Sequence, residues 1–251
     1  MERIESPKNP KIKAWKKLHT KRGREKSVLF FIEGRHLIEE ALKANLPFVE
    51  LIIREGEEMP KEWKAADVKP VEVTARVMKE LSETETPQGF AAVCELPENV
   101  NIPLETGQFL FLDRIQDPGN MGTIIRTAHA AGVTGIAYSE GTADPYNSKV
   151  IRSTQGSLFH IPVQKMDLQE AIALCKENGV PVFGTSFDGS TYSAIEPQQK
   201  FALLLGNEGQ GIDEELLAQT DHNLYIPLYG GAESLNVSVA AGILLYHLKV
   251  V

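Results

Sequence analysis

The sequence predicts an α/β protein of two domains, each built around a mostly parallel sheet. Short apolar runs alternate with helical patterns along the chain, which is typical of strands joined by crossover helices. A polar, proline-containing stretch over 95–107 interrupts the alternation, which then restarts more strongly. We therefore expect a smaller domain over 1–97, a linker over 98–107 and a larger domain over 108–251.

The first series contains four apolar runs and three helical patterns. Strands are predicted at Val28–Ile32, Val49–Ile53, Val71–Val73 and Phe90–Val93, and helices at Pro10–Leu18, Arg35–Ala44 and Ala75–Leu81. The third strand is short because Pro70 stands at its start and has no backbone N–H to give to a sheet ladder.

The second series has the same alternation with stronger apolar runs. Strands are predicted at Phe109–Leu112, Gly135–Tyr138, Val180–Gly184, Phe201–Leu205 and Leu224–Pro227, and helices at Asn120–Ala131, Leu168–Asn178, Asp213–Gln219 and Leu235–Leu248. No internal repeat or low-complexity tract interrupts either series.

The composition is that of an ordinary globular protein, with 42% hydrophobic and 24% charged residues among 251. The two cysteines, Cys94 and Cys175, lie far apart and outside any CxxC pair, so neither a disulfide framework nor a cysteine zinc site is expected. The chain begins with charged residues and proline instead of an apolar signal region, and it has no apolar run of about 20 residues. We expect a cytoplasmic protein without a membrane segment or a metal site.

The charge is distributed unevenly along the chain. The net charge is −8, yet residues 1–26 hold ten lysines and arginines against three glutamates, a net +7 that leaves −15 for the rest. A concentrated basic patch suits local contact with phosphates, whereas the alternative is a solvated amphipathic helix. The predicted nucleic-acid contacts are Lys11, Lys13, Lys16, Lys17, Lys21, Arg22 and, farther along the chain, Arg35.

Three glycine-containing loops follow predicted strands, and ligands of parallel sheets bind at the carboxyl ends of strands. In the first loop, Gly119 and Gly122 permit close backbone approach, and Asn120 offers an amide at a helix start. Arg126 lies within about two turns of Asn120 and can share a face with it. The alternative for this segment is an ordinary loop and cap, with Arg126 in a surface ion pair.

The second loop, LLLGNEGQGI, contains Gly206, Asn207, Glu208 and Gly211. It is not a Walker A motif because no GK[ST] follows, and the chain has no GxGxxG. Glu208 can accept hydrogen bonds from a ligand or, alternatively, cap the next helix.

The third loop begins at Ile226 and runs through Gly230-Gly231 into the final helix. Ser234, Asn236 and Ser238 open that helix, and the small residues that follow them permit close packing of helices or subunits. Plain N-capping is the alternative role for the serine and asparagine side chains.

These loops, in this order, resemble those of the SpoU family of RNA ribose methyltransferases over residues 109–249. The family's motifs are present as N-x-G-x-x-x-R at Asn120, Gly122 and Arg126, as G-N-E-x-x-G at Gly206–Gly211 and as S-L-N-V-S-V-A at Ser234–Ala240. Residues Asn147–Val163 are similar to the family's Lys/Arg–Gly–Ala/Ser–Phe segment. The N-terminal third resembles, more weakly, a module like ribosomal protein L30e, mainly in SPKNPKIKAWKKL and FFIEGRHLIEEAL.

The resemblance implies an α/β trefoil-knot methyltransferase domain preceded by an L30e-like substrate-binding domain. It also implies a homodimer to which the final helix contributes, and S-adenosylmethionine as the cofactor. The knot is an exception to the rule that protein chains are unknotted. The implied cofactor-binding residues are Thr185, Gly206, Asn207, Ile226, Leu228 and Leu235, and the implied catalytic residues are Arg126, Asn120, Glu208, Ser234 and Asn236.

Arg126 is the family's proposed base for the ribose 2′-hydroxyl, which is a poor nucleophile until its proton is accepted. Arginine is protonated at ordinary pH, so orienting the hydroxyl and an RNA phosphate is the alternative role. We expect ribosomal RNA as the substrate, with transfer RNA second. Two other classes compete with this function: a non-catalytic RNA-binding or assembly protein on the same fold, and a dinucleotide-dependent enzyme.

Overall fold

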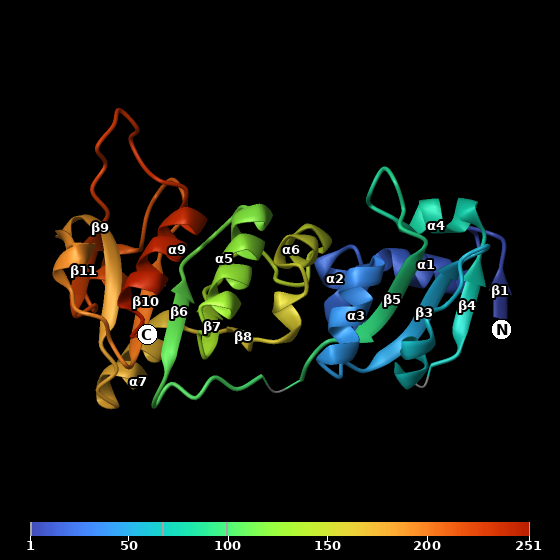
Figure 1. Ribbon diagram of the computed structural model, residues 1–251, viewed down its shortest axis with the longest axis horizontal. Coiled ribbons are helices and arrows are strands. Elements are labelled where there is room, and N and C mark those ends of the chain that lie inside the picture. Colours follow the sequence, from blue (N-terminus) through green and yellow to red (C-terminus); the bar gives the residue numbers. More distant parts are fainter. Residues whose placement is uncertain (1, 67, 99, 251) are drawn as a thin grey trace. The chain divides into compact units, whose positions relative to one another are not determined.

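The computed structural model describes residues 2–66, 68–98 and 100–250 (Figure 1). The chain forms two compact units, one of residues 1–98 with 146–159, and one of residues 99–145 with 160–251. All the strands and helices predicted from the sequence occur, with ends shifted by a few residues. Each unit is described here by itself.

The first unit has a five-stranded mixed sheet in the order β1-β4-β3-β5-β2. The strands are β1 Glu2–Ile4, β2 Leu29–Glu33, β3 Phe48–Arg54, β4 Pro70–Val73 and β5 Phe90–Glu95, and the helices are α1 Pro10–Lys17, α2 Lys21–Ser27, α3 Arg35–Lys43, α4 Ala75–Leu81 and the 3-10 helix η1 Lys61–Ala66. Strand β5 runs antiparallel to β2 and β3, whereas the other pairs are parallel. A mostly parallel sheet was predicted for this unit, whereas the observed sheet is mixed because β5 is antiparallel to both of its neighbours.

Helices α1 and α2 are joined by a tight turn that has a local cause. The side chain of Asn9 caps α1 by accepting from the Lys11 amide, and that of Thr20 caps α2 by accepting from the Gly23 amide. A Cβ atom at Gly23 would lie 1.9 Å from the carbonyl oxygen of Lys17, so only glycine fits there. Helix α2 was not predicted because KRGREKS has no apolar period for the sequence pattern to reveal.

The segment 146–159 packs with the first unit, although the sequence division placed it in the larger domain. It contains α6 Ser148–Thr154 and the 3-10 helix η2 Ser157–Phe159. The ring of Phe30 lies 5.0 Å from that of Tyr146 and 6.2 Å from that of Phe159. Partial burial of Tyr146 and Phe159 against the buried ring of Phe30 draws the segment onto the first unit, since large rings remove much apolar surface from water.

The second unit has a six-stranded sheet in the order β11-β9-β10-β6-β7-β8. The strands are β6 Gln108–Leu112, β7 Gly135–Tyr138, β8 Val163–Lys165, β9 Val182–Thr191, β10 Phe201–Leu205 and β11 His222–Tyr225, and the helices are α5 Pro118–Ala130, α7 Leu168–Glu177, α8 Glu214–Leu217, α9 Val237–Leu248 and the 3-10 helix η3 Tyr192–Ala194. Every pair is parallel, which confirms the predicted parallel sheet.

The centre of this sheet is covered on both faces. All residues of β10 and all of β6 from Phe109 onward are buried, as expected for inner strands of a parallel sheet. Phe109 and Leu204 pack in one cluster with Ile172 of α7, whereas α5 and α9 lie side by side (Figure 1). In the part of the chain that is described, no helix is both long and apolar enough to span a membrane. The trefoil knot stays a prediction.

Candidate functional site

The strand order places the predicted loops at one edge of the second unit. Strand β10 lies between β9 and β6, and β11 is the other neighbour of β9. Because these strands are parallel, their carboxyl ends meet at the same edge, where the loops after β6, β9, β10 and β11 begin. The backbone amide of Asp113, just after β6, donates to the carbonyl of Leu205 at the end of β10 (2.8 Å).

One network joins the three motif loops through Asn120, Glu208 and Asn236. The side-chain amide of Asn120 donates to Oε1 of Glu208 (3.0 Å), and that of Asn236 donates to Oδ1 of Asn120 (2.9 Å). These residues were predicted as site residues, and the structure brings them together from loops far apart in the sequence. The side chain of Asn120 donates one hydrogen bond through Nδ2 and accepts another through Oδ1, and the two bonds together fix the orientation of its amide group.

The carboxylate of Glu208 also contacts the backbone before α5. The amides of Gln116 and Asp117 point to its two oxygens, each at 3.3 Å. Partial burial raises the pKa of Glu208, but the hydrogen bonds from Asn120 and from backbone amides outweigh burial and lower the pKa below its usual value. The alternative that Glu208 caps the helix after it is wrong, because Asp213 caps α8.

Asn120 and Asn236 differ in their relation to the helices that follow the loops. Asp117 caps α5 by accepting from the Asn120 amide (2.8 Å), so the side chain of Asn120 is not needed as a cap. Asn236 does cap α9, since its Oδ1 accepts from the Ser238 amide (2.8 Å). Asn236 therefore holds the start of α9 and the network at the same time.

Arg126 lies on α5 with its side chain exposed. Among the described residues, its guanidinium makes no ion pair or hydrogen bond, so the surface ion pair proposed as an alternative is not formed with them. Six residues along an ideal helix turn through roughly 600°, which leaves the side chains of Asn120 and Arg126 about 120° apart. The structure thus places Arg126 outside the network of Asn120, Glu208 and Asn236.

Ser234 lies in the irregular segment between β11 and α9, which extends as a long loop (Figure 1). Ser234 and Leu235 are both exposed there, and Tyr229 is 96% exposed. Within the described residues, Ser234 makes no hydrogen bond. No hydrogen bond to a described residue fixes the side chain of Ser234, so its position depends on the backbone of the segment 226–236.

The predicted cofactor-binding residues lie around the ends of β9, β10 and β11. Thr185 of β9 donates to the carbonyl of Leu204 (3.5 Å), and Gly206 directly follows β10. A Cβ atom at Gly206 would lie 2.2 Å from backbone atoms of Gly211 and Ile212, so this close approach requires glycine. Asn207 is half-buried in the same loop, whereas Ile226, Leu228 and Leu235 follow β11.

These loops combine the features of a small-molecule binding site. At Gly211, Gly230 and Gly231 an added Cβ would meet nothing within 4 Å, so the backbone there borders open space. Ile226 and Leu228 offer half-buried apolar side chains, and the strand ends offer amides and carbonyls. A few polar backbone groups among apolar side chains are the usual composition of such a site.

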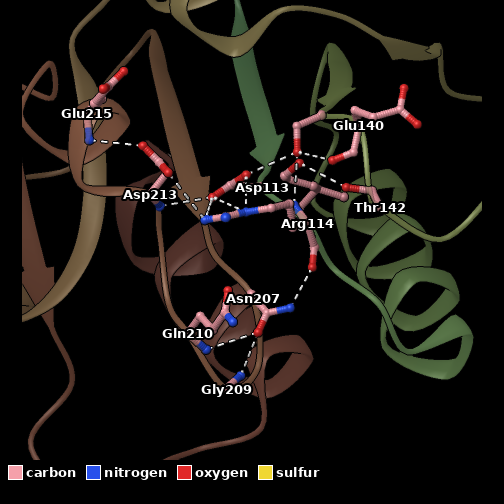
Figure 2. A network of polar contacts seen from close by, with 11 residues as sticks. Asp113, Arg114, Glu140, Thr142, Asn207, Gly209, Gln210, Asp213 and Glu215 are labelled. Atoms are coloured by element: carbon pink, nitrogen blue, oxygen red, sulfur yellow. Dashed lines mark hydrogen bonds and ion pairs between the residues drawn. The ribbon is translucent and has the colours of Figure 1, made fainter.

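The sequence analysis missed the part played by Asp113 and Arg114, which follow β6 (Figure 2). The Asp113 carboxylate is buried and accepts from Arg114 Nη2 (3.0 Å), Ser139 Oγ (3.1 Å) and the Asp213 amide (2.9 Å). Arg114 has a left-handed φ of 52°, and its carbonyl accepts from the side-chain amide of Asn207 (2.8 Å). An aspartate directly after a strand was the available signal, but its partners Ser139 and Asp213 lie 26 and 100 residues away in the sequence.

A groove of about 660 Å³ lies beside Asp113 and Arg114, at the ends of β6, β7 and β8. Its charged lining residues are Asp113, Arg114, Glu140, Lys165, Asp167, Asp213 and Glu215. Acidic side chains predominate, and Lys165 is already paired with Glu140. This lining does not suit an RNA phosphate.

Neither cysteine can act as a nucleophile in this fold. Cys94 and Cys175 are free and buried. Burial raises the pKa of the Cys94 thiol and raises that of Cys175 to about 12, so both stay protonated at neutral pH. No cluster of three or more potential metal ligands occurs among the described residues.

The predicted RNA-contacting residues all lie in the first unit and fall into two groups. Lys11, Lys16, Lys21 and Arg35 make ion pairs with glutamates, for example Lys16 with Glu80 at 2.8 Å. Lys13, Lys17 and Arg22 are exposed and have no ion pair with any described residue. Arg24, which was counted in the basic segment, is buried and donates to the carbonyl of Leu18.

Comparison with known proteins agrees with this geometry. The sequence model of the SpoU rRNA Methylase family matches residues 107–246, and that of the MRM3-like substrate binding domain matches residues 9–92. The first match contains the loops after β6, β10 and β11, and the second contains the basic segment from Asn9 onward.

Individual relatives match over nearly the whole chain. A 23S rRNA (guanosine(2553)-2′-O)-methyltransferase of Bacillus subtilis (strain 168) is 48% identical over 99% of this chain and 100% of its own length. The AdoMet-bound rRNA methyltransferase of Sinorhizobium meliloti has a TM-score of 0.88 and 31% identity over 98% of this chain and 97% of its own. The methyltransferase AviRb of Streptomyces viridochromogenes, in complex with AdoMet, has a TM-score of 0.85 and 28% identity over 96% and 97%.

Proposed function

Because the chain belongs to the SpoU rRNA Methylase family, we propose that it methylates a ribose 2′-hydroxyl of 23S ribosomal RNA. The sequence-based prediction of an S-adenosylmethionine-dependent RNA 2′-O-methyltransferase is confirmed at the level of the family. The Bacillus subtilis relative is named for guanosine 2553, and the target proposed here is the equivalent guanosine. Transfer RNA, the second expectation from the sequence, is the alternative substrate that the experiments below test.

The network of Asn120, Glu208 and Asn236 is the observation that carries this proposal. It holds the loops of all three family motifs together by hydrogen bonds of 2.9 and 3.0 Å. A non-catalytic RNA-binding protein has no need of a polar network at the strand ends, where a parallel sheet binds its ligands. The intact network therefore favours the enzyme over the assembly protein.

Thr185, Gly206, Asn207, Ile226, Leu228 and Leu235 are the residues proposed to hold S-adenosylmethionine. When bound, that cofactor supplies a methyl group on a positively charged sulfur. The close backbone approach at Gly206 and the open space at Gly230–Gly231 let main-chain groups contact the ligand, while Ile226 and Leu228 offer apolar contact.

Arg126 is proposed to act on the RNA side of the reaction. Its guanidinium is exposed and without a partner in the described chain, so it is available to bind a phosphate beside the target ribose. A bound phosphate and the fixed positive charge orient the 2′-hydroxyl and stabilise the oxygen as its proton leaves. Asn120, Glu208, Ser234 and Asn236 are proposed to shape the pocket and position the RNA.

Residues 1–97 are proposed as the RNA-binding domain, and residues 108–251 as the methyltransferase domain after a linker over 98–107. Exposed Lys13, Lys17 and Arg22 support this division, because they can neutralise phosphates without first breaking an ion pair. Lys11, Lys16, Lys21 and Arg35 would have to exchange a glutamate for a phosphate and should contribute less each.

A homodimer through the second unit, with its trefoil knot, is part of this proposal. Val239 and Tyr246 of α9 are 49% and 59% exposed and seven residues apart, so they lie on one face of the helix. An exposed apolar face of this kind is typical of a surface that another chain covers. A ribosomal RNA substrate also supports the expected cytoplasmic location.

Two measurements test the proposed function. Ribose 2′-O-methylation is mapped across total RNA from cells with and without the gene, and one 23S position is expected to lose its methyl group. Loss of a methyl group from a transfer RNA instead would make transfer RNA the substrate. If no position loses its methyl group, the proposed methylation is contradicted. In parallel, S-adenosylmethionine should raise the Tm of the pure protein whereas NAD should not, which separates this function from that of a dinucleotide-dependent enzyme.

A further inference from the structure

The loop Gly206–Asp213, called here the 206–213 loop, is attached at both ends to a single residue, Asp113. At the start of the loop, the Asp113 amide donates to the carbonyl of Leu205 (2.8 Å). At its end, Oδ2 of Asp113 accepts from the Asp213 amide (2.9 Å). The residue that follows β6 therefore determines the distance between the two ends of the loop.

The middle of the 206–213 loop is attached through Arg114. The left-handed φ of 52° at Arg114 turns its carbonyl toward the loop, where it accepts from Nδ2 of Asn207 (2.8 Å). Oδ1 of the same asparagine accepts from the amides of Gly209 (2.9 Å) and Gln210 (3.0 Å). The side chain of Asn207 therefore shapes the loop, and its backbone N–H and C=O close the loop by hydrogen bonds with Gly211 (2.9 and 3.0 Å).

The Asp113 carboxylate holds this arrangement because it is itself held. The residue is 2% exposed, and its oxygens accept from Ser139 Oγ and from Nε and Nη2 of Arg114 (Figure 2). Nη2 of Arg114, which donates to Asp113, also lies 3.7 Å from Oδ2 of Asp213. A buried carboxylate with several charge-assisted hydrogen bonds has one well-defined position, and the loop inherits that position.

We propose that Asp113 is a positioning residue for the cofactor loop, acting through Arg114 and the Asp213 amide without contacting the ligand. This inference rests on the proposed function, in which Gly206 and Asn207 bind S-adenosylmethionine. Asp113 then controls the affinity for the methyl donor and leaves the affinity for RNA unchanged. Glu208 lies in the same loop, but its carboxylate is held separately by Asn120 and the backbone amides of Gln116 and Asp117, so the contacts on the RNA side keep their own support.

The test compares Asp113→Asn in the full chain with the wild type. The amide keeps the size of the carboxylate but loses its charge and one acceptor oxygen. We expect the Kd and the KM for S-adenosylmethionine to rise about tenfold or more, the effect of losing a charge-assisted hydrogen bond, while the KM for RNA stays within about twofold. Amide hydrogen exchange should accelerate at Gly209, Gln210 and Gly211 but not in β6 or β10.

Two further variants keep the result interpretable. Ile136→Val removes a methyl group from β7 in the same unit, outside the core cluster that contains Ile212 of the loop, and controls for a general loss of stability. Arg114→Gly removes the guanidinium while permitting the left-handed φ, and tests the same support if Asp113→Asn fails to fold. It should weaken S-adenosylmethionine binding in the same direction.

The inference would be overturned if Asp113→Asn left both the affinity for S-adenosylmethionine and the exchange rates in the loop unchanged. It would also be overturned if Ile136→Val, at an equal Tm, weakened the binding of S-adenosylmethionine as much as Asp113→Asn. Amide hydrogen exchange can be measured without methyltransferase activity, so this test of the inference does not depend on the proposed function. A wild-type chain that neither binds S-adenosylmethionine nor methylates RNA would contradict the proposed function separately.

Discussion

The side-chain amide of Asn236 donates to Oδ1 of Asn120 (2.9 Å) across 116 residues of sequence, while its own Oδ1 caps α9. One side chain thus performs two tasks that substitution can separate. Aspartate at this position keeps the capping oxygen but has no N–H to give to Asn120. Alanine removes both interactions.

We therefore expect Asn236→Asp to fold with nearly the wild-type Tm yet to lose most methyl transfer. Asn236→Ala should lose the activity and also about 1 kcal/mol of stability, the usual effect of removing an N-cap. Thermal unfolding and a methylation assay on the two variants separate the contribution of the N-cap from that of the hydrogen bond to Asn120. Wild-type activity in Asn236→Asp would show that only the cap is important.

Arg126→Ala should abolish methyl transfer and leave the Kd for S-adenosylmethionine nearly unchanged, because the guanidinium makes no hydrogen bond or ion pair with any described residue. Arg126→Lys keeps the charge but loses the planar fork, so partial activity is expected from an orienting role. Activity of the lysine variant that appears only at high pH would instead favour a base. Lys176→Ala removes another exposed cation of the same unit, one that is paired with Asp221 and lies on α7, and controls for the loss of a positive charge alone.

Glu208→Gln should loosen the loop, since an amide has one acceptor oxygen where the carboxylate serves Asn120, Gln116 and Asp117. The pKa of Glu208 is lowered in the folded chain. The stabilisation from its charge is therefore present above the unfolded pKa of about 4.3 and lost as the pH falls through the folded pKa. The difference in Tm between wild type and variant should be constant from neutral pH to about pH 5 and shrink below pH 4. A difference that grows on acidification would contradict this assignment.

Reversing the charge of Lys13, Lys17 and Arg22 should weaken RNA binding for many sequences alike, because phosphate contacts carry no sequence code. If each contacts one phosphate, the slope of log affinity against log salt should fall by roughly 2 to 3, at about 0.7–0.9 per contact. Lys79→Glu changes an exposed lysine on α4 of the same unit and should have little effect. An unchanged slope in the triple variant would mean that the basic segment is only a solvated surface.

The intact chain is the right background for these charge variants. The segment 146–159 packs with the first unit, and its residues Ile151 and Leu158 are buried there. A chain beginning near Asn101 would expose them to water, so a loss of activity on truncation would not isolate RNA binding.

The sequence by itself determined the parallel architecture of the second unit and the loops that carry its chemistry. Runs such as FLFL and FALLL have no polar residue to place in water, so they are restricted to the inner positions of a covered sheet. Glycines and polar residues in the loops after the strands mark the ligand edge and include Asn120, Glu208 and Asn236, whose catalytic roles the resemblance to the SpoU family implied. Elements without such a pattern were missed: β1 and β8 have three residues each, and α2 has no apolar period.

Only the tertiary structure decided which of these side chains meet. Asn120 pairs with Glu208 and Asn236 but not with Arg126, although Arg126 is on the same helix. The contact between Asp113 and Asp213 likewise depends on β10 (Phe201–Leu205) lying beside β6 (Gln108–Leu112), which pairs residues 93 positions apart in the sequence, such as Phe201 with Gln108. Strand order is set by which packing buries the most apolar surface in the whole unit, and no short stretch of sequence contains that information. Local pattern therefore identifies the loops, whereas the geometry of the site comes from the global arrangement of the strands.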